Sequence, residues 1–171
     1  DLATESPTLQ RESLRIICHW AARNSLRVES WDVKSAFQQA DTRYDPESKQ
    51  QEKGLWIAPP KDFPTKYKLG PVDNRKAIRV PDNQTLYGMA SAPRKFYFYL
   101  RGIMLKHGFR VSKFDECVFL WKQNGKVTGV VGFHVDDGIL AGNASFWSAM
   151  ESVSKDLQFG SRKKSPLNIV V

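Results

Sequence analysis

The sequence predicts an α+β protein in which one antiparallel sheet has its helices packed on one face. Three segments repeat their apolar residues at helical spacing, and the segments between them resemble short β-strands. Two of those strands flank Asn124-Gly125, and Asn-Gly between apolar runs is typical of a tight hairpin turn. Helices that precede and follow such antiparallel strands form a layered α+β domain.

The first half of the chain is predicted to hold a helix, a strand and a long excursion. Apolar residues at helical spacing predict a helix over 8–24. Residues 26–32 alternate in polarity, which predicts a strand that ends at Asp32 and is followed by a short turn or helix. Residues 41–85 are polar and rich in proline, so we expect a long excursion with one strand, at 55–58.

The second half is predicted to complete the sheet. A helix is expected over 89–108, where helical periodicity resumes and ends at a glycine. Strands follow at 117–122 and 126–134, around the Asn-Gly turn, and a short third strand at 139–141. The final helix is expected from residue 146 to 157, where apolar residues recur every three or four positions.

Composition limits the class of protein. A length of 171 residues fits a single domain, 1–171, and the 41% hydrophobic and 26% charged fractions are typical of a globular chain. Lys and Arg number 26 against 18 Asp and Glu, a net charge of +8. Such an excess favours a polyanionic partner such as nucleic acid. The alternatives are a protein that is merely basic, or one that meets RNA or an anionic membrane inside a larger assembly.

The cysteines and the lengths of the apolar runs indicate the cellular compartment that we expect for this chain. Cys18 and Cys117 lie far apart in apolar surroundings, so we expect free thiols and an intracellular, reducing compartment: cytoplasm, nucleus or organelle interior. No apolar run reaches about 18 residues, so no membrane-spanning helix is expected. The chain begins at Asp1 without a signal-like segment, and we expect it to be a fragment or a processed piece.

Asp136 and Asp137 stand side by side between two apolar runs. Adjacent carboxylates repel each other, and a divalent cation with oxygen ligands is a common compensator. The alternative is that Asp137-Gly138 is only a hairpin turn. Asp32, at the end of a predicted strand, can join the pair if that strand lies beside the hairpin. Three carboxylates at one rim could then hold two divalent ions about 4 Å apart, the arrangement that nucleotidyl transfer uses.

Five blocks of the chain carry a resemblance to a known family: WDVKSAF at 31–37, LWIAPPKDF at 55–63, LYGMASAPRKFYFYL at 86–100, GFRVSKFDECVFLW at 108–121 and FHVDDGILAG at 133–142. In this order they resemble DVKTAFLNG, M-x-x-P-x-G-F, LYGLKQAPRAWY, GF-x-x-S-x-x-D-x-x-LF and YVDD of the reverse transcriptase of copia-type LTR retrotransposons. The resemblance is to the palm with part of the fingers. No thumb, integrase or RNase H portion is recognised.

The resemblance implies a ferredoxin-like polymerase palm that extends a primer with deoxynucleoside triphosphates (dNTPs) on an RNA template. It implies Mg²⁺, with Mn²⁺ as an alternative, bound by Asp32, Asp136 and Asp137, which would also be the catalytic residues. Phe37 is similar to the aromatic residue that family members place under the sugar, where it would clash with a 2′-hydroxyl. A plain core aromatic is the alternative interpretation of Phe37.

Two further residues are carried over from the LYGLKQAPR pattern as substrate-binding. Arg94 matches its arginine and would steer phosphate or template, or else simply solvate a helix face. Ser91 stands where the family has a glutamine expected near the base of the incoming nucleotide. His134 replaces the usual tyrosine before the aspartate pair. Loss of the glutamine places normal nucleotide selection in question, whereas the histidine would contact the primer end less well or be a tolerated, half-buried strand residue.

Two functions follow from these observations. The first is an RNA-directed DNA polymerase whose partners are an RNA or DNA template-primer and dNTPs. The alternative is a non-catalytic, transposon-derived palm remnant that serves as a structural or RNA-binding subunit beside other proteins. Basic charge suits either one, because phosphate contacts supply affinity that is independent of sequence.

Overall fold

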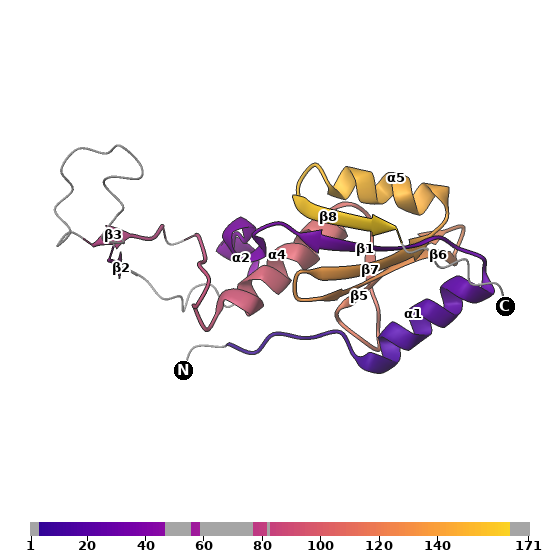
Figure 1. Ribbon diagram of the computed structural model, residues 1–171, viewed down its shortest axis with the longest axis horizontal. Helices are drawn as coiled ribbons and strands as arrows, with labels where there is room; N and C mark the ends of the chain where they lie inside the picture. Colours follow the sequence, from indigo (N-terminus) through magenta and orange to yellow (C-terminus); the bar gives the residue numbers. More distant parts are fainter. Residues whose placement is uncertain (1–3, 47–55, 59–76, 82, 165–171) are drawn as a thin grey trace.

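A computed structural model describes residues 4–46, 56–58, 77–81 and 83–164. Its main feature is a six-stranded sheet with the order β4-β5-β6-β7-β1-β8, in which all neighbours are antiparallel, so the predicted antiparallel sheet is confirmed (Figure 1). The strands are β1 (Val28–Val33), β4 (Arg110–Val111), β5 (Val118–Gln123), β6 (Lys126–His134), β7 (Asp137–Gly142) and β8 (Phe159–Lys164). A separate two-stranded sheet pairs β2 (Trp56–Ile57) with β3 (Ile78–Arg79).

The predicted excursion over 41–85 is described only in part. It begins with a short 3-10 helix, and the predicted strand at 55–58 is observed as the two residues of β2. Residues 47–55 and 59–76, which include most of the LWIAPPKDF block, lie outside the described residues. The hairpin at Asn124-Gly125 is confirmed, because both residues have positive φ, 49° and 76°, as a type I′ turn requires.

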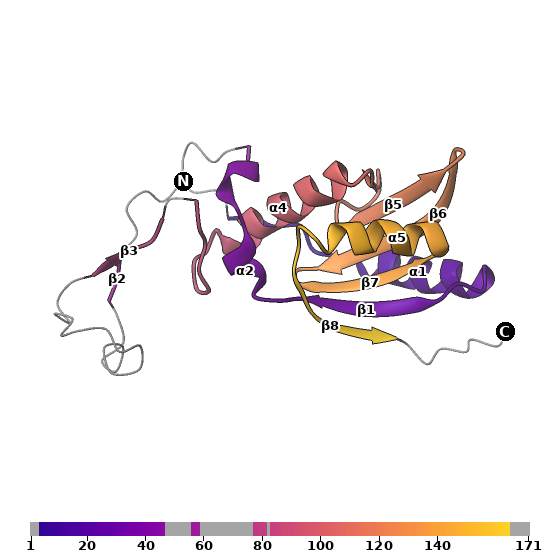
Figure 2. The ribbon, with the colours of Figure 1, turned by 90° about the horizontal axis from the view of Figure 1, so that it is seen from above.

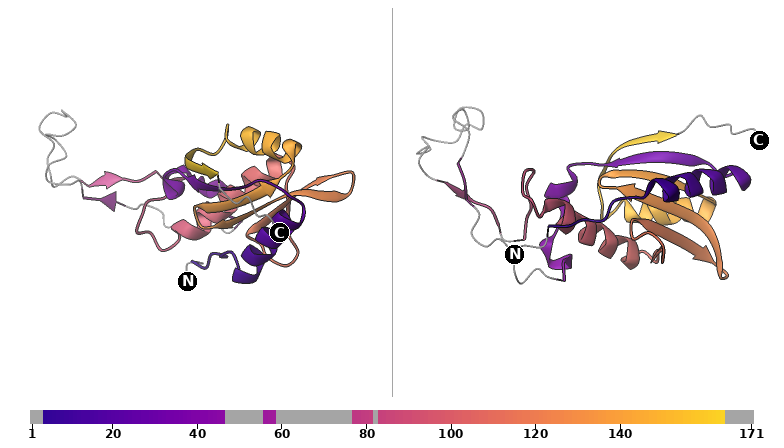
Figure 3. Two further views of the ribbon diagram at one scale, coloured as in Figure 1. Left: turned by 45° about the vertical axis from the view of Figure 1, so that its right-hand side comes forward. Right: turned by 90° about the horizontal axis from the view of Figure 1, so that it is seen from below.

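Helices cover both faces of the sheet, which corrects the expectation that they pack on one face. They are α1 (Arg11–Arg23), α2 (Ala36–Gln39), the 3-10 helix η1 (Thr42–Tyr44), α4 (Ala92–Lys106) and α5 (Ala144–Val153). Ile17 of α1 packs against Val118 and Val130, on the face opposite to the main core. Figure 2 shows α5 in front of the sheet and α1 behind it, and the view from below in Figure 3 shows the reverse.

The burial pattern of β6 explains why the second face of the sheet is also covered. Its residues from Gly129 to Phe133 are buried in succession, rather than at every second position. A strand buried on both sides needs a cover on each, and α1 supplies the second. The main core lies on the other face, under α4 and α5, and its largest fully buried side chains include Trp31, Phe96, Phe119, Phe133, Phe146 and Met150.

Strand β8 forms an edge of the sheet beside β1, and it was not predicted from the sequence. Its side chains are exposed apart from Phe159, so no apolar alternation marks it. Backbone pairing with β1 and a cation-π contact define it instead, with the Arg162 guanidinium 4.1 Å from the Trp31 ring centroid. The pairing shifts register between Asp32 and Val33, opposite Gly160.

Gly129 and Gly142 are cross-strand partners that make room for one aromatic ring. A Cβ on either glycine would collide with the Phe146 side chain. We expect Gly129→Ala to lower the free energy of unfolding by about 2 kcal/mol through overpacking, measured by urea denaturation. In a Phe146→Leu background the same substitution should cost less, because the smaller side chain can move aside. Equal costs in the two backgrounds would contradict this packing.

Among the described residues, no helix is long and apolar enough to cross a membrane. Cys18 and Cys117 are both free thiols, as expected, although only Cys117 is buried. Burial raises the pKa of the Cys117 thiol to about 12, so it stays protonated at neutral pH. A reducing compartment stays a prediction.

Candidate active site

Asp32 and Asp137 lie directly opposite each other on neighbouring strands. β1 and β7 pair with Asp32 and Asp137 as Cα partners, which confirms that the strand ending near Asp32 lies beside the aspartate pair. Because side chains alternate along a strand, Asp32 lies on the face opposite to Trp31 and Val33, both of which belong to the main core. The two carboxylates therefore share the α1 side of the sheet, at the strand ends.

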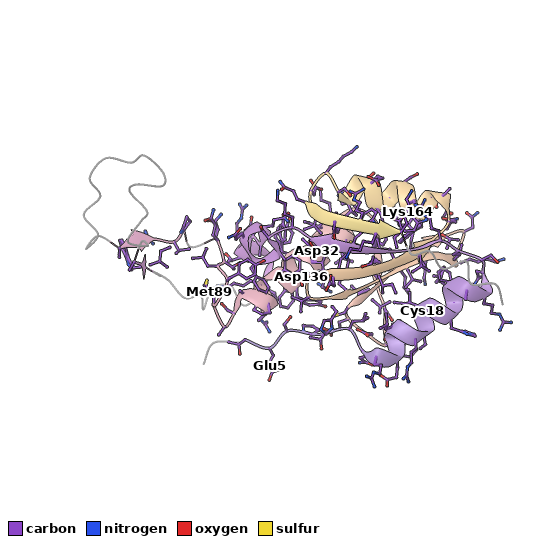
Figure 4. The ribbon with its side chains drawn as sticks, viewed as in Figure 1. Glu5, Cys18, Asp32, Met89, Asp136 and Lys164 are labelled. Carbon is purple, nitrogen blue, oxygen red and sulfur yellow. The ribbon has the colours of Figure 1, made fainter. Side chains whose placement is uncertain are left out.

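Asp136 completes the group from a tight turn. His134 pairs with Asp137, so Val135 and Asp136 form the loop between β6 and β7. The Asp136 carbonyl accepts a hydrogen bond of 2.9 Å from the Val33 amide, which ties the turn to the end of β1. Figure 4 shows Asp32 and Asp136 at the same end of the sheet. The alternative turn at Asp137-Gly138 was wrong in position, because those residues begin β7.

The turn is held in a conformation that its sequence does not favour. Val135 has a φ of 58°, the value that the first central position of a type II′ turn needs and that glycine usually supplies. A β-branched residue in this region is strained, by about 1–3 kcal/mol. Val135 also lines a small apolar pocket with Pro7, Cys117 and Phe133. The hydrogen bond from the Val33 amide to the Asp136 carbonyl holds the backbone of this turn against the end of β1.

The Asp32 carboxylate lies against the backbone of β8. A Cβ on Gly160 would stand 2.9 Å from Asp32 Oδ2, so glycine leaves the space in which this carboxylate sits. Asp32 and Asp136 are half-buried and Asp137 is exposed. Sequence reasoning missed Gly160, because its role depends on β8 lying beside β1.

The three aspartates fit a divalent cation by donor chemistry, since hard cations take carboxylate oxygens. The placement of Asp32 and Asp137 on the same face of the sheet is consistent with such an ion. Within the described residues, however, no three His, Cys, Asp or Glu side chains are already gathered in a metal-binding arrangement. Like charges directly opposite on a sheet repel, so uncompensated carboxylates turn apart. A cation would have to draw them together.

Phe37 forms an aromatic pair at the same end of the sheet. It lies in α2, which starts after Ser35 with φ 48°, five residues beyond Asp32. The Phe37 ring centroid is 4.9 Å from that of Tyr87 and 6.3 Å from that of Phe96. Phe37 is half-buried, whereas Tyr87 is 58% exposed. Sequence reasoning did not single out Tyr87, although it lies in the LYGMASAPR block.

A hydrogen bond fixes the loop that carries Tyr87. The Thr85 hydroxyl donates to the Phe37 carbonyl, and Thr85 is 1% exposed. Gly88, which follows Tyr87, has a φ of 92° that permits the chain to turn toward α4. The loop is therefore anchored to α2 at one end and to α4 at the other, with the Tyr87 ring presented to solvent.

The remaining two predicted residues lie where α4 begins. Arg94 forms an ion pair with Asp45, Nε to Oδ2 at 3.3 Å, and its guanidinium lies 4.9 Å from the Phe98 ring centroid. Ser91 precedes the helix and is 2% exposed. α4 packs against α2, which carries Phe37, so these residues belong to the same end of the fold as the aspartates (Figure 1).

Comparison with known proteins finds relatives of this chain among transposon polyproteins. The retrovirus-related Pol polyprotein from transposon TNT 1-94 of Nicotiana tabacum is 27% identical over 137 residues, 80% of this chain and 9% of that protein. The corresponding polyproteins from transposons RE1 and RE2 of Arabidopsis thaliana are each 31% identical over 82% of this chain and 8% of their own length. The chain thus spans 8–9% of these relatives.

A solved structure that also aligns is the apo telomerase from Candida tropicalis truncated from its C-terminal domain. The alignment has a TM-score of 0.49 and 13% sequence identity, and it covers 93% of this chain and 35% of the telomerase chain. A family model described as reverse transcriptase (RNA-dependent DNA polymerase) matches residues 1–161. This match and the transposon relatives confirm the resemblance to copia-type retrotransposons: the chain belongs to the reverse transcriptase family.

Proposed function

We propose that this chain is the palm, with part of the fingers, of an RNA-directed DNA polymerase that extends a primer with dNTPs by two-metal nucleotidyl transfer. The observation that carries the proposal is the pairing of Asp32 with Asp137, beside a turn in which the Asp136 carbonyl bonds the Val33 amide. Membership of the reverse transcriptase family supports it.

In this proposal Asp32, Asp136 and Asp137 hold Mg²⁺, with Mn²⁺ as an alternative. Bound there, the ions would activate the primer 3′-hydroxyl and stabilise the charge that develops on the phosphate oxygens. Asp32 and Asp136 project from positions that backbone hydrogen bonds fix, so their carboxylates need little reorganisation beyond rotation. Asp137 is exposed and acts as the outer member of the group.

Aromatic and basic residues supply the proposed contacts to substrate. Phe37 excludes the 2′-hydroxyl of a ribonucleotide, and its contact with Tyr87 keeps the ring from moving aside. Arg94 would contact phosphate or template while Asp45 holds its guanidinium in place. The exposed Lys163 of β8 pairs with Ser30 of β1, so it lies on the same face as Asp32. There it would contact the nucleic-acid backbone.

Primer extension tests the proposal. With Mg²⁺, a poly(rA) template and an oligo(dT) primer, we expect this chain to incorporate dTTP and the Asp136→Asn variant to lose that activity. Glu12→Gln, which removes a carboxylate from the exposed face of α1, should extend like the unsubstituted chain. Equal extension, or none, by the unsubstituted chain and Asp136→Asn would contradict catalysis by this chain and leave the RNA-binding alternative.

A further inference from the structure

Within the part of the chain that the structure describes, two buried polar side chains at the start of α4 have no side-chain hydrogen bond or ion pair. Ser91 is 2% exposed and Lys95 is 3% exposed. They stand four residues apart, so they lie on the same side of the helix, one turn from each other. Ser91 stands where the family pattern has a glutamine that is expected near the incoming nucleotide. Lys95 stands where the family pattern has an alanine, so the family supplies no role for it.

The Ser91 hydroxyl lacks the bond that its position usually makes. A serine before a helix normally accepts a hydrogen bond from the second or third helical amide. Here Pro93 removes one of those amides, and Ser91 makes no such capping bond. Its Oγ is one of two buried side-chain polar atoms in the described residues that have no hydrogen-bond partner. A buried hydroxyl left in this way costs free energy that a ligand could recover.

Lys95 differs from its neighbour Arg94 in its ion pairing. Arg94 is neutralised by Asp45. Among the described residues, no carboxylate forms an ion pair with Lys95. The Lys95 ammonium is not among the described polar atoms that are both unpartnered and fully buried. The aliphatic stem is therefore buried while the ammonium still reaches solvent. An anion could therefore reach this charge from outside.

We propose that Ser91 and Lys95 form a phosphate-binding site at the N-terminus of α4. The helix dipole favours negative charge at that end, the ammonium supplies the opposite charge, and the Ser91 hydroxyl donates a hydrogen bond. α4 starts at the same end of the sheet as α2 and the turn with Asp136, in both Figure 1 and Figure 2. The phosphate belongs to a free nucleotide or to a nucleic-acid backbone, and the site requires no metal.

Inorganic triphosphate, titrated into this chain by calorimetry without divalent cations, tests the site. Lys95→Met keeps an apolar stem and should weaken binding about tenfold or more, while Ser91→Ala should weaken it about threefold. Lys95→Arg keeps the charge and should retain most of the affinity. Lys126→Met removes one positive charge at the exposed end of the β5–β6 hairpin and should change affinity less than about twofold.

A second titration with a single-stranded RNA 12-mer identifies the source of the phosphate. Loss of triphosphate affinity alone in Lys95→Met assigns the site to a free nucleotide, and loss of RNA affinity alone assigns it to the backbone. Unchanged binding of both ligands by Lys95→Met, or an equal loss in Lys126→Met, would overturn the proposal. The titrations contain no divalent cation and measure no primer extension, so failure of the polymerase function would leave this result intact.

Discussion

Replacing Asp32 by asparagine is expected to lower primer extension about 10³-fold, and replacing Asp136 as well is expected to add little. Each bound cation contributes several kcal/mol of transition-state stabilisation, and about 1.4 kcal/mol corresponds to a tenfold change in rate. Because Asp32 and Asp136 would hold the same ions, the first substitution already removes most of that stabilisation. Single-turnover extension rates of both single variants and the double variant measure this effect.

The size of the coupling decides whether the two aspartates act as one site. Independent roles would make the losses multiply, so that the double variant falls as the product of the two single losses. If the two rate losses multiply in this way, Asp32 and Asp136 do not hold the same ions, even if each single substitution lowers the extension rate. Glu12→Gln again serves as the control, because it removes a carboxylate without touching the candidate site.

Asp115→Ala is expected to cause the largest loss of stability, about 3 kcal/mol. The Asp115 carboxylate accepts a hydrogen bond of 3.0 Å from the Gln10 amide, just before α1, and one of 2.9 Å from the Cys117 amide. Asp115 is 5% exposed, so alanine would leave both amides without this partner. Hydrogen bonds to charged groups contribute about 1.5–3 kcal/mol each. Urea denaturation of the variant gives the loss directly.

The neighbouring Phe114 supplies the matched control. It is 92% exposed, so Phe114→Ala should change the free energy of unfolding by less than about 0.5 kcal/mol. A stability loss for Phe114→Ala as large as that for Asp115→Ala would contradict the assigned role of Asp115. The hydrogen bonds from the Gln10 and Cys117 amides to Asp115 would then not be what stabilises the fold at this position.

Local chemistry and resemblance were sufficient to predict the elements with strong patterns. Apolar periodicity placed α1, α4 and α5, and Asn124-Gly125 marked the hairpin because few other residues accept positive φ. Asp32 could be placed beside the Asp136-Asp137 pair in advance, because an antiparallel sheet can bring the ends of such strands together, but the register that sets Asp32 opposite Asp137 came only from the structure. Five blocks in register, rather than spacing alone, pointed to the family.

Features fixed by tertiary contacts could not be predicted. β8 is a polar edge strand, and only its pairing with β1 and the stacking of Arg162 on Trp31 distinguish it from a loop. The second helix-covered face depends on how far β6 is buried, which an apolar run does not reveal. Gly160 matters to Asp32 through that same unpredicted strand. Nothing in the sequence distinguishes Lys95 from an exposed helix cation, and only the structure shows that it is buried.

Paramagnetic broadening by Mn²⁺ shows whether Asp32, Asp136 and Asp137 bind divalent cations together. In amide NMR spectra of this chain, stoichiometric Mn²⁺ should broaden the signals of residues 32–33 and 135–138 first. In Asp32→Asn that selective broadening should disappear, while Glu12→Gln should retain it. Broadening centred elsewhere in the chain, or unchanged signals at these residues, would contradict cation binding by the three aspartates.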